Sequence, residues 1–286
     1  MWTGSSEAPP TVRIAMLAPS LQPSERRVAE AIVGDVEAAI ERTAQQVADL
    51  VGVGRASVIR TAQSLGYDGY PELRVALVRE VALSGPPADE KTDGTMLGTL
   101  RGAVDRFAGR LNHTVSALTE EALQDLVRAV DESQRLLIAA NGLSAPLGLD
   151  LAMRLISAGR PAEYVPDTLG QQITAKQLGP GSACLVISGS GANRASLEVM
   201  TAARESGATV LVITSFPNSP AARLSDTALV IAPISDSFRD ELVHTSRAAL
   251  MLVTESIVGL LVERRGPSAR TAQSATLSVI SRSLSD

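Results

Sequence analysis

Short apolar runs of strand length punctuate the second half of the chain, and segments with helical spacing lie between them. The runs span residues 136–140, 184–187, 210–213 and 228–231, with a shorter candidate at 163–165. Continuous apolar runs of this length are typical of strands that are covered on both faces. Strands that alternate with helices imply right-handed crossovers, so the pattern predicts a parallel sheet within a three-layer α/β/α domain.

The first third of the chain has helical periodicity instead. Apolar residues recur every four positions at 28, 32, 36 and 40. This spacing predicts one helix over about 23–39. A second helix is expected to begin near Thr43, because Thr43 and Gln46 have the spacing of a capping box. A third is predicted over 55–65 and ends at Gly66, so the N-terminal domain is predicted to be all α.

The second and third of these helices are joined by the tight turn Gly52-Val53-Gly54, which is the arrangement of a helix-turn-helix unit. In such a unit the second helix enters the major groove with its N-terminal residues nearest the bases. Those residues are Arg55, Ala56 and Ser57, with Arg60 one turn later. The planar fork of arginine pairs with guanine edges and with phosphate. An ordinary three-helix bundle with solvated arginines is the alternative interpretation.

The charge distribution limits where nucleic acid can bind. The chain has 26 Lys and Arg against 31 Asp and Glu, a net charge of −5, which argues against coating DNA by bulk charge. Residues 21–50 contain three arginines and six acids, a net charge of −3, whereas residues 51–79 contain four arginines and two acids, a net charge of +2. DNA contact is therefore expected on and after the predicted reading helix.

Two sequence motifs mark that helix. Residues 53–60, which lead into it and form its first half, read VGRASVIR, and residues 65–74, which begin at its end, read LGYDGYPELR. They resemble the N-terminal domain of the RpiR family of bacterial transcriptional regulators. The chain departs from the family pattern at Gly54, which replaces a serine cap, and at Thr61, which replaces an aromatic core residue. Glycine is a tolerable cap, but Thr61 is expected to loosen packing behind the reading helix unless Ile59 or Ala62 compensates. The resemblance implies a helix-turn-helix domain that binds operator DNA.

Two loops of small polar residues directly follow predicted strands. Asn141-Gly142-Leu143-Ser144 follows the first run, and Ser188-Gly189-Ser190-Gly191-Ala192-Asn193 follows the second and opens a helix. Small residues let backbone N–H groups approach a ligand, and a helix N-terminus adds partial positive charge, so such loops can cradle phosphate. A plain strand-to-helix turn with serine caps is the alternative for either loop alone.

The segment from about 136 to 264 resembles the SIS (sugar isomerase) domain, on the strength of the two loops and of the segment 241–246, which reads ELVHTS. SIS domains bind phosphosugars, and in the RpiR family the domain serves as the effector sensor. Asn141 replaces a glycine of the family pattern, and Asn193 replaces a threonine. The ligand-binding residues implied by the resemblance are Asn141, Ser144, Ser188, Ser190, Asn193 and Glu241.

The predicted organisation follows from a change of composition. Residues 84–94 are polar, rich in proline and glycine and without periodicity, as is typical of a linker. The predicted parts are a helix-turn-helix domain (18–83), a linker (84–95), a SIS-like domain (96–265) and a C-terminal tail (266–286).

Cysteine and histidine are too scarce for a multi-residue metal centre, since the chain contains only Cys184, His113 and His244. No metal and no cofactor is expected. His244 follows Glu241 by three residues; an acid–base pair is one interpretation, and an ordinary structural helix pair is the favoured one. With no apolar segment of membrane-spanning length and no signal-peptide pattern, we expect a cytoplasmic location without membrane contact.

We therefore expect a transcriptional regulator and not an enzyme. Its expected partners are operator DNA and a phosphosugar effector, and a homodimer or higher homo-oligomer would present two reading helices to two half-sites. One alternative is a phosphosugar aldose–ketose isomerase, which needs a positioned base and has no use for residues 1–95. Another is a constitutive DNA-binding protein whose α/β domain serves only for dimerisation.

Overall fold

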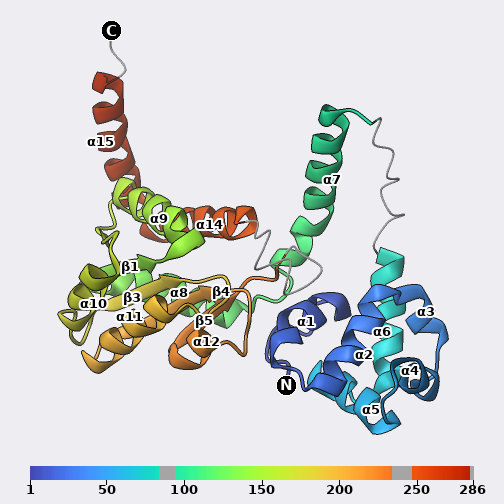
Figure 1. Ribbon diagram of the computed structural model, residues 1–286. Helices are drawn as coiled ribbons and strands as arrows, with labels where there is room; N and C mark the ends of the chain where they lie inside the picture. The colour runs from blue at the N-terminus through green and yellow to red at the C-terminus, as the bar shows by residue number, and fades with distance from the viewer. Residues whose placement is uncertain (84–93, 234–246, 284–286) are drawn as a thin grey trace. The chain divides into compact units, whose positions relative to one another are not determined.

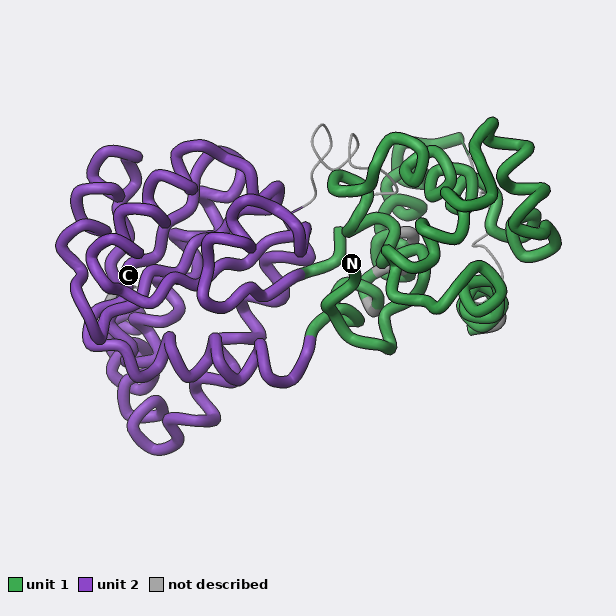
Figure 2. Tube along the Cα trace, turned by 90° about the horizontal axis from the view of Figure 1, so that it is seen from below, with its two compact units in different colours: residues 1–118, 231–246 green, residues 119–230, 247–286 purple. Residues whose placement is uncertain are grey.

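The computed structural model describes residues 1–83, 94–233 and 247–283. The chain forms two compact units (Figure 2). Met1–Leu118 together with Ile231–Ser246 form the first, and Thr119–Val230 together with Arg247–Asp286 form the second. No helix of the described residues is long and apolar enough to cross a membrane.

The first unit is helical, as predicted. Its elements are α1 (Pro10–Leu17), a 3₁₀ turn (Ala18–Ser20), α2 (Pro23–Gly34), α3 (Val36–Glu41), α4 (Ala44–Val51), α5 (Arg55–Ser64), α6 (Tyr70–Leu83) and α7 (Met96–Thr114). Helices α1 to α6 share one hydrophobic core, in which Val28, Val58 and Leu73 have no exposed surface. Ile14 and Leu17 belong to the same core, although they precede the start predicted for this domain at residue 18.

The prediction of one helix over 23–39 is wrong, because the chain breaks between α2 and α3. Helix α2 ends at Gly34, and Asp35 starts a new helix by accepting a hydrogen bond from the backbone N–H of Ala38 at 2.9 Å. A residue that caps a helix adopts non-helical backbone angles, and here Asp35 has φ −156° and ψ 84°. The four-residue spacing of apolar positions continues across the break, so periodicity alone does not reveal it.

The second unit contains a five-stranded parallel sheet in the order β2-β1-β3-β4-β5, which confirms the predicted sheet. The strands are β1 (Leu136–Ala140), β2 (Glu163–Tyr164), β3 (Ala183–Ile187), β4 (Thr209–Thr214) and β5 (Thr227–Val230). Every residue of β1 and β3 is buried, as expected for central strands covered on both faces.

Helices cover both faces of this sheet and complete the predicted three layers (Figure 1). One layer is built from α8 (Glu120–Glu132), α9 (Ala145–Ser157) and α14 (Ala248–Arg265). The other is built from α10 (Thr168–Lys176), α11 (Arg194–Glu205) and α12 (Pro220–Leu224). Alternate residues of β1, β3 and β4 pack under this second layer, together with Val199 and Met200 of α11.

The segment predicted as a C-terminal tail is largely helical, because α15 spans Pro267–Ser283. Ala272 of this helix packs so closely on Gly159, just after α9, that a Cβ at residue 159 would lie 2.6 Å from the Cβ of Ala272. Gly159 has φ +77°, a left-handed conformation that favours glycine. Most of the predicted linker lies outside the described residues, as do Glu241 and His244.

Candidate functional site

Helices α4 and α5 form the helix-turn-helix unit. The capping box at the start of α4 is confirmed: the Thr43 hydroxyl accepts from the N–H of Gln46 at 3.3 Å, and the Gln46 side chain accepts from the N–H of Thr43 at 2.8 Å. Helix α4 ends at Gly52, which has φ +68°, a conformation that glycine adopts without strain. The turn then leads into α5 through Gly54, whose extended backbone is suitable for an N-cap.

The four predicted DNA-contacting residues occupy two different environments on α5. Arg55 and Ala56 are exposed at its N-terminus. Ser57 is buried, and its hydroxyl accepts a hydrogen bond from Nη2 of Arg60 at 3.0 Å. Nε of Arg60 also lies 3.8 Å from a carboxylate oxygen of Glu25 in α2. Ser57 is thus placed to orient Arg60, whereas Arg55, Ala56 and Arg60 are exposed on the surface of α5.

Thr61 takes the place expected for an aromatic core residue and is completely buried. Its hydroxyl donates to the carbonyl of Ser57 at 2.8 Å, one turn back in the same helix. A buried hydroxyl that is hydrogen-bonded avoids the large cost of an unsatisfied polar group. The chain therefore tolerates threonine here, and Ala62 and Val58 beside it are also fully buried.

The loop after β3 is held against the end of β4. The carbonyl of Gly189 accepts from the N–H of Ser215 at 2.9 Å and from the hydroxyl of Thr214 at 3.2 Å. Gly191 has φ +60°, and a Cβ there would overlap the side chains of Thr214 and Ser219. Glycine is required at this position, because both the backbone angle and the close approach exclude a side chain.

Two backbone N–H groups of this loop are available to hydrogen-bond a ligand. No hydrogen-bond partner for the N–H of Gly189 or Ser190 lies in the described part of the chain. Helix α11, with twelve residues, begins just beyond and directs its positive end at the loop. Successive backbone N–H groups next to a helix N-terminus form a concave site for an anion.

Arg247 adds a full positive charge to this loop. It stands at the start of α14, and its Cζ lies 2.9 Å from the position that a Cβ on residue 189 would occupy. The guanidinium thus occupies the space that a side chain on residue 189 would take, and glycine lets it lie directly against the loop backbone. Arg247 was not predicted from the sequence, although it directly follows the 241–246 segment.

The two unusual asparagines take part in a network that joins the loops of β1 and β3. Nδ2 of Asn141 donates to Oε1 of Gln171 at 3.0 Å and to the hydroxyl of Ser196 at 3.2 Å. Asn193 caps α11, because its Oδ1 accepts from the N–H of Ser196 at 3.1 Å. Gln171 is completely buried and donates in turn to the carbonyl of Val165 at 2.9 Å. Gln171 and Ser196 carry no motif and were not predicted.

The predicted serines also lie at the carboxyl ends of β1 and β3. Ser144 is buried at the start of α9, and Ser188 is buried directly after β3. The hydroxyl of Ser190 accepts from the N–H of Ala192 at 3.3 Å and is half-buried. The structure thus gathers five of the six predicted ligand-binding residues at this edge of the sheet, and the sixth, Glu241, lies outside the described residues.

A helix-turn-helix unit in one chain with a parallel α/β domain of this kind defines a DNA-binding regulator with a sensor domain. Comparison with known proteins agrees. Residues 11–84 match the family model of the helix-turn-helix domain, rpiR family, and residues 130–254 match the model of the SIS domain. The chain belongs to the RpiR family of transcriptional regulators.

Solved structures with the same fold include both regulators and a protein assigned to the isomerases. The Vibrio vulnificus NanR protein, complexed with ManNAc-6P, has a TM-score of 0.61 at 21% identity, over 96% of this chain and all of that one. The sugar isomerase domain of an RpiR transcription factor from Sphaerobacter thermophilus has a TM-score of 0.55 at 22% identity, over 64% of this chain and 98% of that one. A Bacteroides fragilis protein assigned to the phosphosugar isomerases has a TM-score of 0.51 at 19% identity, over 60% and 92%. At these identities the likeness shows the fold alone.

Proposed function

We propose that this protein binds operator DNA through α5 and that a phosphorylated sugar, bound at the loops after β1 and β3, changes its affinity for that DNA. The observation that carries the proposal is the Gly189–Ser190 anion site beside Arg247, present in the same chain as a helix-turn-helix unit with exposed arginines. The helix-turn-helix unit alone would not support ligand sensing, and the anion site alone would not support DNA binding.

On the DNA side, Arg55 provides an exposed guanidinium at the N-terminal end of α5, where base edges are nearest in helix-turn-helix complexes. Arg60 is held by Ser57 and by Glu25, so its guanidinium is pre-oriented before DNA binds. A side chain that is already ordered loses less conformational entropy on binding.

On the ligand side, the phosphate would accept hydrogen bonds from the N–H groups of Gly189 and Ser190 and from serine hydroxyls, with Arg247 as the counter-charge. The network of Asn141, Gln171 and Ser196 would set the distance between the two loops. Because NanR was solved with ManNAc-6P, this compound is the natural first probe, followed by other sugar 6-phosphates.

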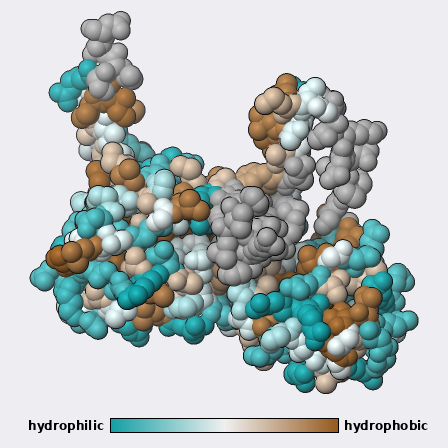
Figure 3. All heavy atoms as spheres, in the orientation of Figure 1, coloured by the Kyte–Doolittle hydropathy of each residue, from teal (hydrophilic) through white to brown (hydrophobic). Residues whose placement is uncertain are grey.

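We further propose that the chain acts as a homodimer through α7. Leu97, Leu100 and Val104 are each more than half exposed, and Phe107 and Leu111 continue their spacing of three and four residues. Apolar residues are visible on the surface of this helix (Figure 3). A seven-residue apolar repeat is the pattern by which two helices pack against each other. A helix of 19 residues that contains three glycines is not stable alone, which supports a partner helix.

Isomerase activity is the rival function, because some structural neighbours are assigned to the isomerases. Proton transfer between two sugar carbons requires a general base within hydrogen-bonding reach. Among the described residues, the side chains around the two loops are amides, hydroxyls and the Arg247 guanidinium, whereas Glu241 and His244 lie outside the part of the chain that the structure describes. We favour a sensor without catalysis, and an aldose–ketose isomerase assay with sugar 6-phosphates tests this directly.

The experiment that tests the proposal is a DNA-binding titration with the DNA upstream of the protein's own gene, with and without ManNAc-6P and a panel of sugar phosphates. Arg55→Ala is expected to weaken operator binding and to leave ligand-induced thermal stabilisation unchanged. Ser190→Ala is expected to do the reverse. Absence of DNA binding at low salt contradicts the regulator, and DNA binding that no sugar phosphate alters contradicts the sensor and favours the constitutive DNA-binding alternative.

A further inference from the structure

The first residues of the chain run alongside the end of the reading helix. Residues 2–13, here called the N-terminal strap, comprise the segment before α1 and the first turn of that helix. The backbone N–H of Trp2 donates to the carbonyl of Ser64, the last residue of α5, at 3.0 Å. The carbonyls at the end of a helix have no partner within the helix, so a donor from elsewhere is needed to satisfy them.

Arg13 is the side chain that fastens the strap. Its guanidinium is buried and donates three hydrogen bonds: Nη1 to the carbonyl of Leu65 at 2.9 Å, Nε to that of Ala8 at 2.9 Å, and Nη2 to that of Ser6 at 2.7 Å. Two of these bonds hold the strap itself, and the third holds the C-cap residue of α5. One planar group therefore joins both segments.

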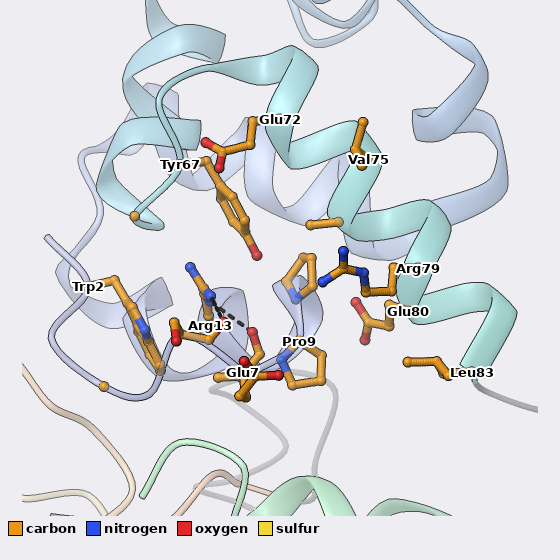
Figure 4. A pocket seen from close by; sticks show the side chains of 16 residues that line it. Trp2, Glu7, Pro9, Arg13, Tyr67, Glu72, Val75, Arg79, Glu80 and Leu83 are labelled. Atoms are coloured by element: carbon orange, nitrogen blue, oxygen red, sulfur yellow. Dashed lines mark hydrogen bonds between the residues drawn. The ribbon is translucent and has the colours of Figure 1, made fainter. Parts of the chain in front are cut away.

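Two aromatic rings enclose the same guanidinium (Figure 4). Its Cζ lies 5.3 Å from the ring centre of Trp2 in the strap and 4.5 Å from that of Tyr67, just after α5. Cation–π contacts of this kind strengthen when the cation is shielded from water. Burial raises the pKa of Tyr67 to about 12, so the phenol stays neutral beside Arg13.

The strap approaches the end of α5 as closely as a glycine permits. Gly66 has φ +88°, and a Cβ there would lie 3.0 Å from the Cβ of Trp2 and 3.2 Å from Nη1 of Arg13. Between the strap and α6, in contrast, the structure has a cavity of about 440 Å³ that Tyr67, Val75 and Leu83 help to line. On that side the strap is tied to α6 by the N–H and the hydroxyl of Thr11, which both donate to the carboxylate of Glu80. On the side of α5, the bonds of Arg13 and the backbone N–H of Trp2 hold it.

We propose that Arg13 is a positioning residue for DNA reading: through the strap it sets the orientation of α5, and with it the placement of Arg55 and Arg60 against the bases. The inference rests on the proposed DNA contact by α5. Arg13 itself is only 5% exposed, so we place its effect on α5 and not in direct contact with DNA. Its removal should therefore change discrimination between sequences more than it changes the general attraction to phosphates.

The test compares Arg13→Met and Arg13→Lys with Arg26→Met as the matched control. The guanidinium of Arg26 also donates to backbone carbonyls, those of Ala18 and Pro19 at 3.0 and 3.1 Å, but both carbonyls lie in the 3₁₀ turn before α2 and not in α5. Each full-length variant is titrated with operator DNA and with unrelated DNA of equal length, well below its own melting temperature. We expect Arg13→Met to lose about tenfold or more in operator affinity, or roughly 1.4 kcal/mol, and less than about twofold for unrelated DNA. Arg13→Lys should recover part of the loss, and Arg26→Met should match the parent protein.

If Arg13→Met lowers the melting temperature but leaves operator affinity unchanged, Arg13 only stabilises the fold, and this result overturns the proposal. An equal loss on both DNAs overturns it too. Amide hydrogen exchange at residues 64–67 tests the role of Arg13 without DNA. The exchange rate should increase in Arg13→Met and not in Arg26→Met. This result is expected even if the parent protein binds no DNA. If Arg13→Met does not fold, Trp2→Ala takes its place, because it removes one ring from Arg13 and leaves all three hydrogen bonds.

Discussion

The side-chain amide of Asn141 donates a hydrogen bond to the hydroxyl of Ser196, which lies 55 residues further along the chain. This bond ties the loop after β1 to the first turn of α11, and the same amide also binds the buried Gln171. The two loops that we propose to contact one ligand are thereby held at one distance before the ligand arrives, which reduces the ordering cost of binding.

Replacing Asn141 by alanine should destabilise the protein by about 1–3 kcal/mol, because the buried Gln171 loses a partner. Urea unfolding measures the change, and affinity for a sugar phosphate should fall in parallel. Gln172→Ala is the matched control, because Gln172 lies next to Gln171 in α10 and its hydrogen bond to Glu198 is exposed. This substitution should change the free energy of unfolding by no more than about 0.5 kcal/mol. Equal effects of the two variants would contradict a structural role for the Asn141 network.

Arg247→Met should weaken the binding of a sugar 6-phosphate by about tenfold or more, since a hydrogen bond to a charged group contributes about 1.5–3 kcal/mol. Calorimetric titration, or the shift of melting temperature with ligand, measures the loss. Arg204→Met serves as control, because Arg204 is in the last turn of α11, at the far end from the loop. If Arg247→Met binds the ligand as tightly as the parent protein does, Arg247 is not part of the site.

A single cysteine introduced at Val104 should form a disulfide-linked dimer under mild oxidation. Val104 is the midpoint of the apolar row from 97 to 111, so it faces its own counterpart whether the two helices run parallel or antiparallel. Leu97→Cys should cross-link only in the parallel arrangement and thus reports the orientation. Asp105→Cys, on the outer side of the helix, is the control; cross-linking at 105 to the same extent as at 104 would rule out the α7 interface.

The cross-linking is interpretable because the native thiol is inert. Cys184 is completely buried in β3, and burial raises the pKa of its thiol from 9.0 to about 12. The folded protein should therefore resist alkylation at pH 8 and react only on unfolding.

The same raised pKa has a consequence for stability. The folded state holds the thiol proton more tightly than the unfolded state, so the stabilisation is fully present below pH 9 and is lost as the pH rises towards about 12. Comparison of urea unfolding of the parent protein and Cys184→Ala across this range should show a steeper loss for the parent. Parallel curves would mean that the thiol titrates alike in both states.

Sequence patterns were sufficient to predict the features that neighbouring residues determine. The capping box at Thr43, the glycine that ends α4 and the buried strands β1, β3 and β4 are set by neighbouring residues and by the period of burial, and all were predicted. The break between α2 and α3 was missed because the apolar spacing continues through it, while the cap that causes it is a single aspartate.

The contacts that assemble the candidate sites come from residues far apart in the chain. Arg13 meets Leu65 across 52 residues, and Asn141 meets Ser196 across 55. Arg247 reaches Gly189 only because α14 begins beside the loop after β3. Periodicity and motifs identify which loops lie at the carboxyl edge of a parallel sheet, since strand direction determines that edge. Which side chains complete those loops depends on how helices pack over the sheet, and no short-range pattern encodes that packing.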